Sequence, residues 1–244
     1  MSLAPGWHPV ALSGSIDPGT SAGTHLAGRE YVVWRDNSGL AHVWEDRCPH
    51  RGMKLSFGFV RGDHIACLYH GWQYDTAGRC RYIPAHPDLE VPATITVPVF
   101  ATVEACGMIW TTTDADPDRA APPPGDGETV PVASLHAACG TEGLLDAVRA
   151  MPAAPFVAGT AGWELSQVGG TLWRLTVGGD TLLLGVQRLG DQRSALHVAI
   201  EGSAAIYAGA GQAHWHAWIR ALRHRLGAGP AVGARPAAAM AEAV

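Results

Sequence analysis

Short runs of apolar and β-branched residues, separated by turn signals, fill residues 1–113 of the chain. Two of these runs flank the turn sequence DNSG, and two others flank DTAGR. Both arrangements predict β-hairpins, because Asp, Asn and Gly favour the backbone conformations of tight turns. No helical period of useful length occurs here, so we predict an all-β domain. The predicted strands cover residues 31–35, 40–45, 72–74, 80–83, 97–103 and 108–111.

The second half of the chain follows a different plan. Four strand-like runs are separated by glycine-containing turns, which predicts an antiparallel meander. Residues 213–226 then read as a helix whose apolar stripe we expect to sit on the sheet, with an interface to a partner as the alternative. The strands cover residues 163–168, 171–177, 181–188 and 195–201, and the apolar stripe consists of Trp215, Trp218, Ile219, Leu222 and Leu226. A second stripe, His216, Arg220, Arg223 and His224, is expected to be a solvated face.

An acidic, proline-rich segment separates the two halves. Residues 114–130 hold five acidic residues and one basic residue and almost no large apolar ones, which predicts a linker. The predicted organisation is an all-β domain over 1–113, this linker, an α+β domain over 131–226 with an antiparallel sheet and a C-terminal helix, and a flexible tail over 227–244. The predicted fold class of the chain is therefore α+β.

Composition narrows the function classes. The chain has 244 residues, of which 47% are hydrophobic and 16% charged, so it can bury a core as one large domain or two small ones. A net charge of −5 gives no reason to expect nucleic acid as a partner. No apolar run approaches the roughly 20 residues that span a bilayer, so no membrane partner is expected. The first residues do not resemble a signal peptide, which favours a cytoplasmic location.

The chemistry is concentrated in two short motifs. Cys48 and His50 form C-x-H, and Cys67 and His70 form C-x-x-H. A tetrahedral zinc site uses two Cys and two His, and so does a Rieske [2Fe–2S] centre, in which the two Cys hold one iron and the two His the other. The C-x-H spacing favours the second, because residues two apart on one loop are poorly placed to chelate a single ion. Zinc and unrelated core positions stay as alternatives.

Residues 5–113 resemble the N-terminal domain of the Rieske non-haem iron oxygenases. The matching stretches are WHPV at 7–10, CPHRG at 48–52, CLYHGW at 67–72 and GMIW at 107–110. The resemblance implies a small β-barrel-like fold with two finger loops around the cluster. It also implies that Cys48 and Cys67 bind the inner iron and that His50 and His70 bind the outer, partly exposed iron. Gly52 and Gly71 are expected to let backbone N–H groups approach the sulfides.

The class of Rieske protein follows from what the loops lack. The high-potential respiratory class resembles C-T-H-L-G-C with C-P-C-H-G-S, and the corresponding positions here hold Met53, Tyr69 and Trp72. The bridging cysteines and the serine hydroxyl donor are therefore absent. Fewer hydrogen bonds to the cluster predict a potential near the low end of the roughly −150 to +300 mV range. Such a potential suits electrons from NAD(P)H through a reductase or ferredoxin.

The second half resembles a degenerate form of the family's catalytic domain, a helix-grip fold. There a mononuclear iron is held by a 2-His-1-carboxylate triad, with a motif like N-L-L-D-x-x-H-x-x-F-V-H. The pieces LLD and FV survive, but Arg149 and Ala158 stand at the two histidine positions. A guanidinium cannot ligate iron, and the remaining histidines are read as unsuitable: His214 and His216 point apart on a helix, and His136 and His197 are isolated. We expect no mononuclear iron, no catalytic residues, and a structural role for Asp146.

The remaining cysteines, histidines and basic residues are interpreted mainly as structural or surface residues. Cys80, Cys106 and Cys139 match no ligand pattern and are expected to be buried or half-buried. The histidines at 25, 42, 64 and 86 are expected to be surface or strand residues. Six cations near the ligands form either a docking rim for an electron donor or a solvated face, and the second is favoured. They are Arg47, Arg51, Lys54, Arg61, Arg79 and Arg81.

Together these patterns predict a Rieske [2Fe–2S] protein that transfers single electrons in a multicomponent oxygenase or demethylase system. The chain would be a non-catalytic or electron-delivering subunit, with a reductase or ferredoxin as donor, a catalytic oxygenase subunit as candidate partner, and a homo- or hetero-oligomeric state. One alternative is a complete oxygenase acting on an aromatic or other small organic substrate. A second is a binding or redox-sensing module with a structural cluster. The substrate of the system and the physiological donor are not encoded in any recognisable motif.

Overall fold

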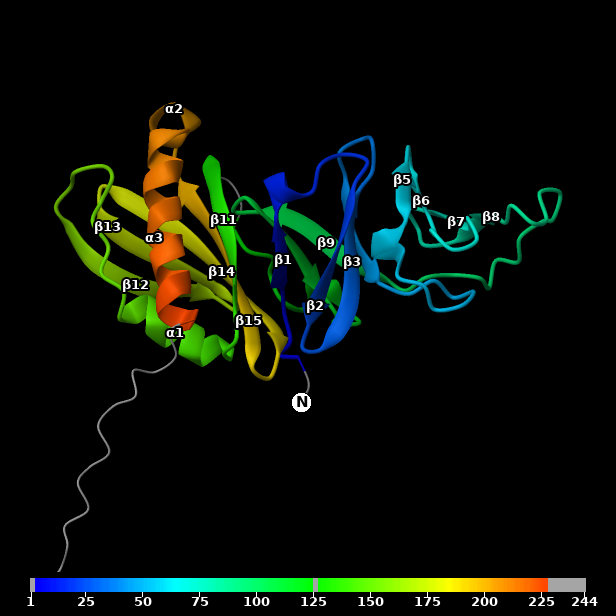
Figure 1. Ribbon diagram of the computed structural model, residues 1–244, viewed down its shortest axis with the longest axis horizontal. Helices are drawn as coiled ribbons and strands as arrows, with labels where there is room; N and C mark the ends of the chain where they lie inside the picture. Colours follow the sequence, from blue (N-terminus) through cyan, green and yellow to red (C-terminus); the bar gives the residue numbers. More distant parts are fainter. Residues whose placement is uncertain (1–2, 125–126, 228–244) are drawn as a thin grey trace, which may run out of the picture.

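The first half of the chain is all-β, as predicted. The computed structural model describes residues 3–124 and 127–227, and Figure 1 shows two β-rich halves side by side with a small lobe at one end. A six-stranded antiparallel sheet has the order β1-β10-β9-β4-β3-β2, and the small lobe is a four-stranded sheet with the order β5-β6-β7-β8. The strands of the two sheets of this first half are β1 (His8–Leu12), β2 (Ser21–Leu26), β3 (Arg29–Arg35), β4 (Ala41–Glu45), β5 (Phe59–Arg61), β6 (His64–Ala66), β7 (Gln73–Asp75), β8 (Cys80–Tyr82), β9 (Val99–Ala105) and β10 (Met108–Thr112).

The second half is a five-stranded antiparallel sheet with helices on one face, so the α+β class is confirmed. The sheet order is β11-β15-β14-β13-β12, which is the predicted meander with one added strand, β11. Its elements are β11 (Thr129–Ala137), α1 (Thr141–Arg149), β12 (Ala161–Gly169), β13 (Leu172–Gly178), β14 (Asp180–Gly190), β15 (Arg193–Glu201), α2 (Ala204–Tyr207) and α3 (Ala210–Gly227).

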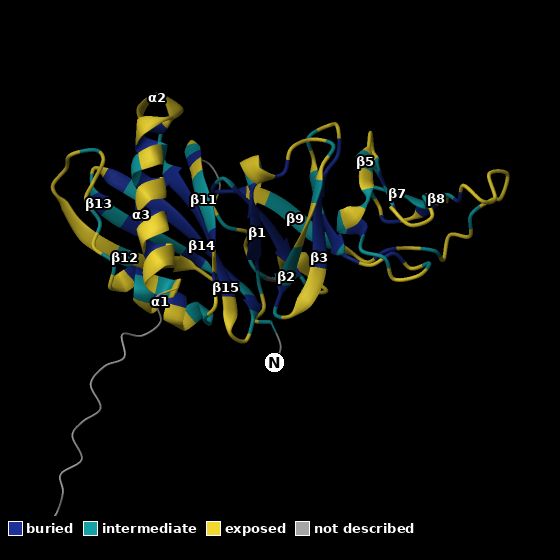
Figure 2. Cartoon of the chain, in the orientation of Figure 1, coloured by how far each residue is buried: buried dark blue, intermediate teal, exposed yellow. Residues whose placement is uncertain are grey.

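The predicted helix seat is confirmed. Trp215, Trp218, Ile219 and Leu222 of α3 are buried in the core of the second half, and Leu226 is partly buried against it. The opposite stripe of α3 is exposed, as predicted, and Figure 2 shows this alternation along the helix. The sheet contributes alternate residues of β14, Leu182, Leu184 and Val186, because successive side chains of a strand point to opposite faces.

The other face of this sheet packs on the first half, which the sequence did not predict. Leu172 and Leu183 share one apolar cluster with Trp7, Met108 and Trp110. The backbones approach closely at Gly185, where a Cβ atom would lie 2.6 Å from the sulfur of Met108. The two halves are therefore joined by a continuous buried interface rather than by a linker alone.

A buried polar network around His197 crosses the same interface. The Nε2 of His197 lies 2.8 Å from Gln187 Oε1, and its Nδ1 lies 2.8 Å from the hydroxyl of Ser134. The Gln187 amide nitrogen donates to Thr24 Oγ1 and to the His25 carbonyl, both on β2. Burial lowers the pKa of His197 to about 3, so the ring is neutral. The hydrogen-bond partners of His197 are residues of neighbouring strands that lie far apart in sequence, so no short sequence motif reveals them.

The predicted boundaries need adjustment at both ends of the second domain. β11 begins at Thr129, so the last two residues of the predicted linker belong to the sheet. The start of the linker lies on the N-terminal segment, because the Gly6 amide donates to Asp114 and the Trp7 indole donates to the Ala120 carbonyl. Of the predicted tail, Gly227 ends α3. Residues 1–2, 125–126 and 228–244 lie outside the described residues.

Several elements were missed by the sequence patterns. β5 and β6 have three residues each, too few to show an alternation, and β1, β2, β11 and α1 gave no clear signal. Within the described part of the chain, no helix is long and apolar enough to cross a bilayer.

Candidate metal centre

Two loops of the same design carry the predicted ligands. In the first, the Gly52 amide donates to the Cys48 carbonyl at 2.8 Å, and the Cys48 amide donates to the Met53 carbonyl at 2.8 Å. In the second, the Gly71 amide donates to the Cys67 carbonyl at 3.0 Å, and the Cys67 amide donates to the Trp72 carbonyl at 2.9 Å. Both glycines have positive φ, +73° and +70°, which is why glycine closes each loop.

The loops bring the four predicted ligands together as two pairs. The Cys48 and Cys67 thiols are hydrogen-bonded to each other and both residues are buried. The rings of His50 and His70 lie side by side with their centroids 4.7 Å apart. His70 is exposed and His50 is half-buried. The result is an inner pair of sulfur atoms and an outer pair of imidazoles at the surface.

Hydrogen-bond donors surround the buried sulfurs. The bond from Cys67 and those from the Tyr74 hydroxyl and the His50 and Arg51 amides lower the pKa of Cys48. The bond to Cys48 and burial raise the pKa of Cys67. The amides near Cys67 are those of Tyr69 and His70. The N–H groups of Gly52 and Gly71 themselves donate to the carbonyls of Cys48 and Cys67. The expectation that these glycines let backbone amides approach the sulfides stays a prediction.

A hydroxyl group at another position lies beside the buried sulfurs. The Tyr74 hydroxyl lies 3.0 Å from Cys48 Sγ, and Tyr74 is fully buried. The serine hydroxyl of the respiratory motif would stand at the position of Trp72 and is absent, as expected. Tyr74 follows two residues later on β7, and strand alternation turns its side chain inward. That alternation is the signal that could have found it.

Aromatic rings flank both imidazoles. The Trp72 ring is stacked on His50, with centroids 4.3 Å apart and the planes 4° from parallel. The Tyr69 ring lies 3.8 Å from the His70 ring, centroid to centroid, and Tyr69 is exposed. These contacts restrict the orientation of the two imidazoles from the side of the protein.

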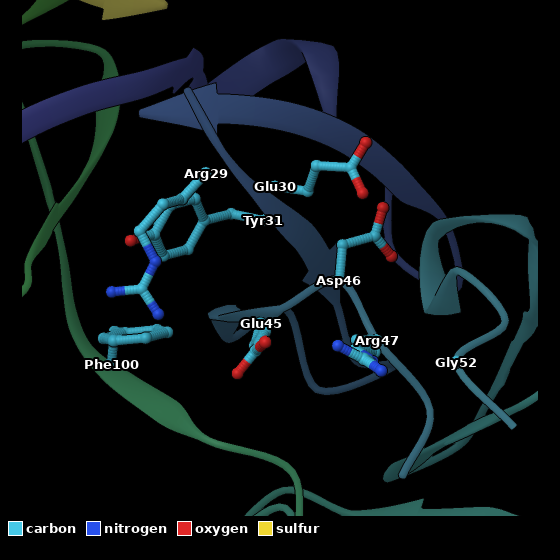
Figure 3. A pocket seen from close by; sticks show the side chains of 8 residues that line it. All are labelled: Arg29, Glu30, Tyr31, Glu45, Asp46, Arg47, Gly52 and Phe100. Atoms are coloured by element: carbon cyan, nitrogen blue, oxygen red, sulfur yellow. The ribbon is translucent and has the colours of Figure 1, made fainter. Parts of the chain in front are cut away.

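The predicted rim of cations is mixed with carboxylates. A hollow of about 350 Å³ lies beside the first loop. Figure 3 shows that Arg47 of the predicted rim, together with Arg29, shares the lining of this hollow with Glu30, Glu45 and Asp46. Lys54 forms an ion pair with Glu30, and Arg81 forms one with Asp63. These pairings agree with the favoured reading of a solvated face, and a docking role for the remaining cations stays a prediction.

The other cysteines are free thiols outside the two loops, although Cys80 packs in the same buried cluster as Cys48 and Cys67. Cys80 and Cys106 are buried and Cys139 is half-buried. Burial raises the pKa of Cys80 and of Cys106, so both stay protonated. The Cys106 thiol donates to the Pro124 carbonyl at 2.8 Å.

The second half has no imidazole at the two positions where the family resemblance places iron ligands. Arg149, the last residue of α1, pairs with Asp146 at 2.8 Å and its guanidinium lies 5.5 Å from the centroid of the Trp173 ring. Ala158 is exposed between α1 and β12. The buried Asp180 carboxylate accepts the Phe156 and Val157 amides, which fixes the surviving FV stretch. Within residues 3–124 and 127–227, no three His, Cys, Asp or Glu side chains gather so as to hold a single metal ion.

Known proteins resemble both the motifs and the fold. Residues 6–100 match the Rieske [2Fe-2S] domain. NdmD, an oxidoreductase of Pseudomonas putida, is 39% identical over 112 residues, which are 46% of this chain and 19% of NdmD. The methylxanthine N1-demethylase NdmA of the same species is 43% identical over 91 residues, 37% of this chain and 23% of NdmA. The structure of NdmA with caffeine, from P. putida CBB5, has a TM-score of 0.70 at 20% identity and covers 97% of this chain and 85% of that one.

Residues 6–100 therefore belong to the Rieske [2Fe-2S] domain family, and the relatives and structural neighbours of the chain are Rieske non-haem iron oxygenases. The aligned segment is about a fifth of the length of NdmD and NdmA, whereas the fold is shared along almost the whole chain. A Rieske domain carries a [2Fe–2S] cluster. The donor set fits this group, because two buried thiols and two outer imidazoles form separate pairs.

Proposed function

We propose that Cys48 and Cys67 hold the inner iron and His50 and His70 the outer iron of a [2Fe–2S] cluster. We further propose that the chain transfers single electrons in a multicomponent Rieske oxygenase or demethylase system, as a non-catalytic or electron-delivering subunit. The observation that carries this proposal is the contrast between the halves. The first half has a complete set of cluster ligands, and the second half has an Arg149–Asp146 ion pair at the first iron-histidine position.

The arrangement of the ligands supports electron exchange at the surface. When bound, the cluster supplies a site that gains or loses one electron at a time. His70 is exposed, so its ring edge offers the shortest path from the outer iron to a partner protein. Trp72 holds His50 on the protein side, and the amides and hydroxyl around Cys48 stabilise negative charge on the buried sulfurs.

The interior of the second half supports a non-catalytic role. Trp215 and Trp218 fill the space between α3 and the sheet together with Leu184 and Tyr207. The cationic Arg149 side chain would repel Fe²⁺ where an imidazole is needed. We propose that this half binds no mononuclear iron, and that it serves as a scaffold for assembly.

The partners follow from this role. A reductase or ferredoxin would supply electrons, and a catalytic oxygenase subunit would receive them in a homo- or hetero-oligomer. A cytoplasmic location and the absence of nucleic-acid and membrane partners are part of the same proposal.

The test is the iron and acid-labile sulfide content of the purified chain, with an EPR spectrum of the reduced protein. We expect two irons and two sulfides per chain and a Rieske-type signal. Three irons per chain would instead support a complete oxygenase acting on a small organic substrate. Zinc without sulfide would overturn the cluster assignment.

A kinetic measurement separates electron transfer from redox sensing. The reduced protein is mixed in a stopped-flow instrument with the oxidised catalytic component of a Rieske oxygenase. Oxidation of the cluster within the turnover time of the oxygenase is expected. A cluster that stays reduced over many turnovers would support the binding or sensing module.

A further inference from the structure

The two loops that carry the proposed ligands differ in what closes their base. The second loop leaves β6 at Ala66 and returns on β7 at Gln73, and these two residues are paired across the hairpin. The first loop follows β4, which pairs with β3 and β9, and it leads to β5, which pairs with β6 in the other sheet of this half. Strand pairing therefore closes the base of the second loop, and the first loop depends on a different contact.

One buried carboxylate joins the two ends of the first loop. Asp46 directly follows β4 and is buried. Its Oδ1 accepts the Ser56 amide at 2.7 Å, and its Oδ2 accepts the Ser56 hydroxyl at 2.6 Å. Ser56 lies in the 3₁₀ helix Leu55–Phe57, whose first N–H groups find no acceptor within the helix, so the carboxylate also caps it. Positions 46 and 56 enclose the whole first loop, including Cys48 and His50.

Neighbouring strands hold this carboxylate in place. The Asp46 amide donates to the Glu30 carbonyl of β3 at 3.2 Å. The backbone of β2 packs against the same contact, because a Cβ atom on Gly23 would lie 3.0 Å from Ser56 Oγ and 3.4 Å from Asp46 Oδ2. The ion pair between Lys54 and Glu30 is exposed and so contributes little. Hydrogen bonds to a buried carboxylate are stronger, which makes Asp46 the main contact at the base of this loop.

The contact also connects to the interior around the sulfurs. Leu55, next to Ser56, is fully buried and belongs to the same apolar cluster as Cys48 and Cys67. A close-packed interior transmits displacements, so a shift of Ser56 would disturb the packing around both cysteines.

We propose that Asp46 is a positioning residue whose carboxylate closes the base of the first loop and so holds Cys48 and His50 opposite the ligands of the second loop. The inference rests on the proposed [2Fe–2S] cluster, because the first loop carries half of its ligands. Without the carboxylate, the first loop opens more often while the paired second loop stays closed. Iron is then lost through this local opening rather than through global unfolding.

The test measures the rate at which the full-length, cluster-loaded protein releases iron to an excess of a coloured iron chelator. Asp46→Ala removes both bonds and should release iron about tenfold faster, the effect of one to two net hydrogen bonds on the open population. Its EPR signal in the reduced state should be broader, because the His50 ligand takes a wider range of orientations. Asp46→Asn should behave nearly as the wild type, since the amide group can accept the Ser56 N–H and donate to its hydroxyl.

Asp36→Ala is the matched control. Asp36 is also buried, and its Oδ1 accepts the Ser38 hydroxyl at 2.6 Å and the Leu40 amide at 3.0 Å, in a hairpin turn that carries no ligand. This variant should lower Tm, as Asp46→Ala does, and release iron at the wild-type rate. Equal acceleration in the two variants would reduce the effect to a general loss of stability and overturn the proposal, as would an unchanged rate in Asp46→Ala.

A second variant covers the case in which Asp46→Ala does not fold or takes up no cluster. Ser56→Ala removes only the hydroxyl bond and should release iron about three- to fivefold faster, and a wild-type rate would contradict the proposal. A wild-type chain without iron and sulfide would overturn the proposed function as well. A stable wild-type cluster with the same release rate in Asp46→Ala and Asp36→Ala would overturn this inference alone.

Discussion

The hydroxyl oxygen of Tyr74 lies 3.0 Å from the sulfur of Cys48, in the buried interior next to the second cluster loop. A cysteine that ligates iron is a thiolate and has no proton to give, so Tyr74 must be the donor. A hydrogen bond to a ligand sulfur withdraws negative charge and favours the reduced cluster. In the proposed centre, the inner pair of ligands would thus be tuned by a side chain 26 positions away in sequence.

The first prediction is that Tyr74→Phe lowers the midpoint potential of the cluster. A net hydrogen bond of about 1 kcal/mol, felt mainly in the reduced state, corresponds to a shift of roughly 20–60 mV for one electron. The measurement is a redox titration followed by EPR. Iron content should stay at the wild-type level, because Tyr74 is not a ligand. A potential that does not change would show that the hydroxyl is no donor to the ligated sulfur.

The second prediction concerns the ligand assignment. Cys48→Ser should lose most of its iron and acid-labile sulfide together with the EPR signal, because a serine alkoxide is a poor substitute for a thiolate. Cys139→Ser is the matched control and should keep the full cluster, since Cys139 is half-buried away from the two loops. Retention of iron and sulfide by Cys48→Ser would contradict the assignment.

The third prediction tests the interface between the halves. In Gly185→Ala the new methyl group would lie 2.6 Å from the Met108 sulfur and 3.1 Å from a Pro9 side-chain carbon. Such overpacking should lower the free energy of unfolding by about 1–3 kcal/mol, a fall in Tm of several degrees. Gly162→Ala, on the exposed strand β12 with open space around it, should leave Tm nearly unchanged. Similar melting curves for both variants would argue that the halves do not share a tight core.

The fourth prediction concerns pH. Burial lowers the pKa of His197 to about 3 in the folded protein, whereas the side chain in the unfolded chain has a pKa of about 6.5. Between these two values the unfolded chain binds a proton at this ring and the folded chain does not. Its contribution to stability is complete above pH 6.5 and is lost as the pH falls toward 3. Between pH 7 and pH 5 this group alone should cost about 2 kcal/mol. Urea unfolding at both pH values should show a smaller loss for His197→Gln than for the wild type. The same loss in both proteins would refute the argument.

The sequence patterns gave the best predictions where the structure is local. The hairpins around residues 36–39 and 75–79 and the helix that became α3 were found because turn chemistry and helical spacing are properties of short segments. The two loops that carry the candidate ligands were also predictable, because each is closed by hydrogen bonds between a cysteine and the residues four and five positions later. Patterns failed for the three-residue strands β5 and β6, which have too few positions to show a period.

The amino-acid sequence by itself determined the types and spacing of the candidate ligands, and it places Arg149 and Ala158 where the family resemblance expects histidines. These follow from side-chain chemistry at neighbouring positions, and a Rieske domain was predictable from them. Only the tertiary structure decided that Tyr74 reaches Cys48, that His197 joins Ser134 to Gln187, and that Gly185 faces Met108. The physical reason is that these contacts depend on strand register and on the packing of one sheet against another. Register and packing are set by many weak interactions between residues far apart in the chain, and no single motif encodes them.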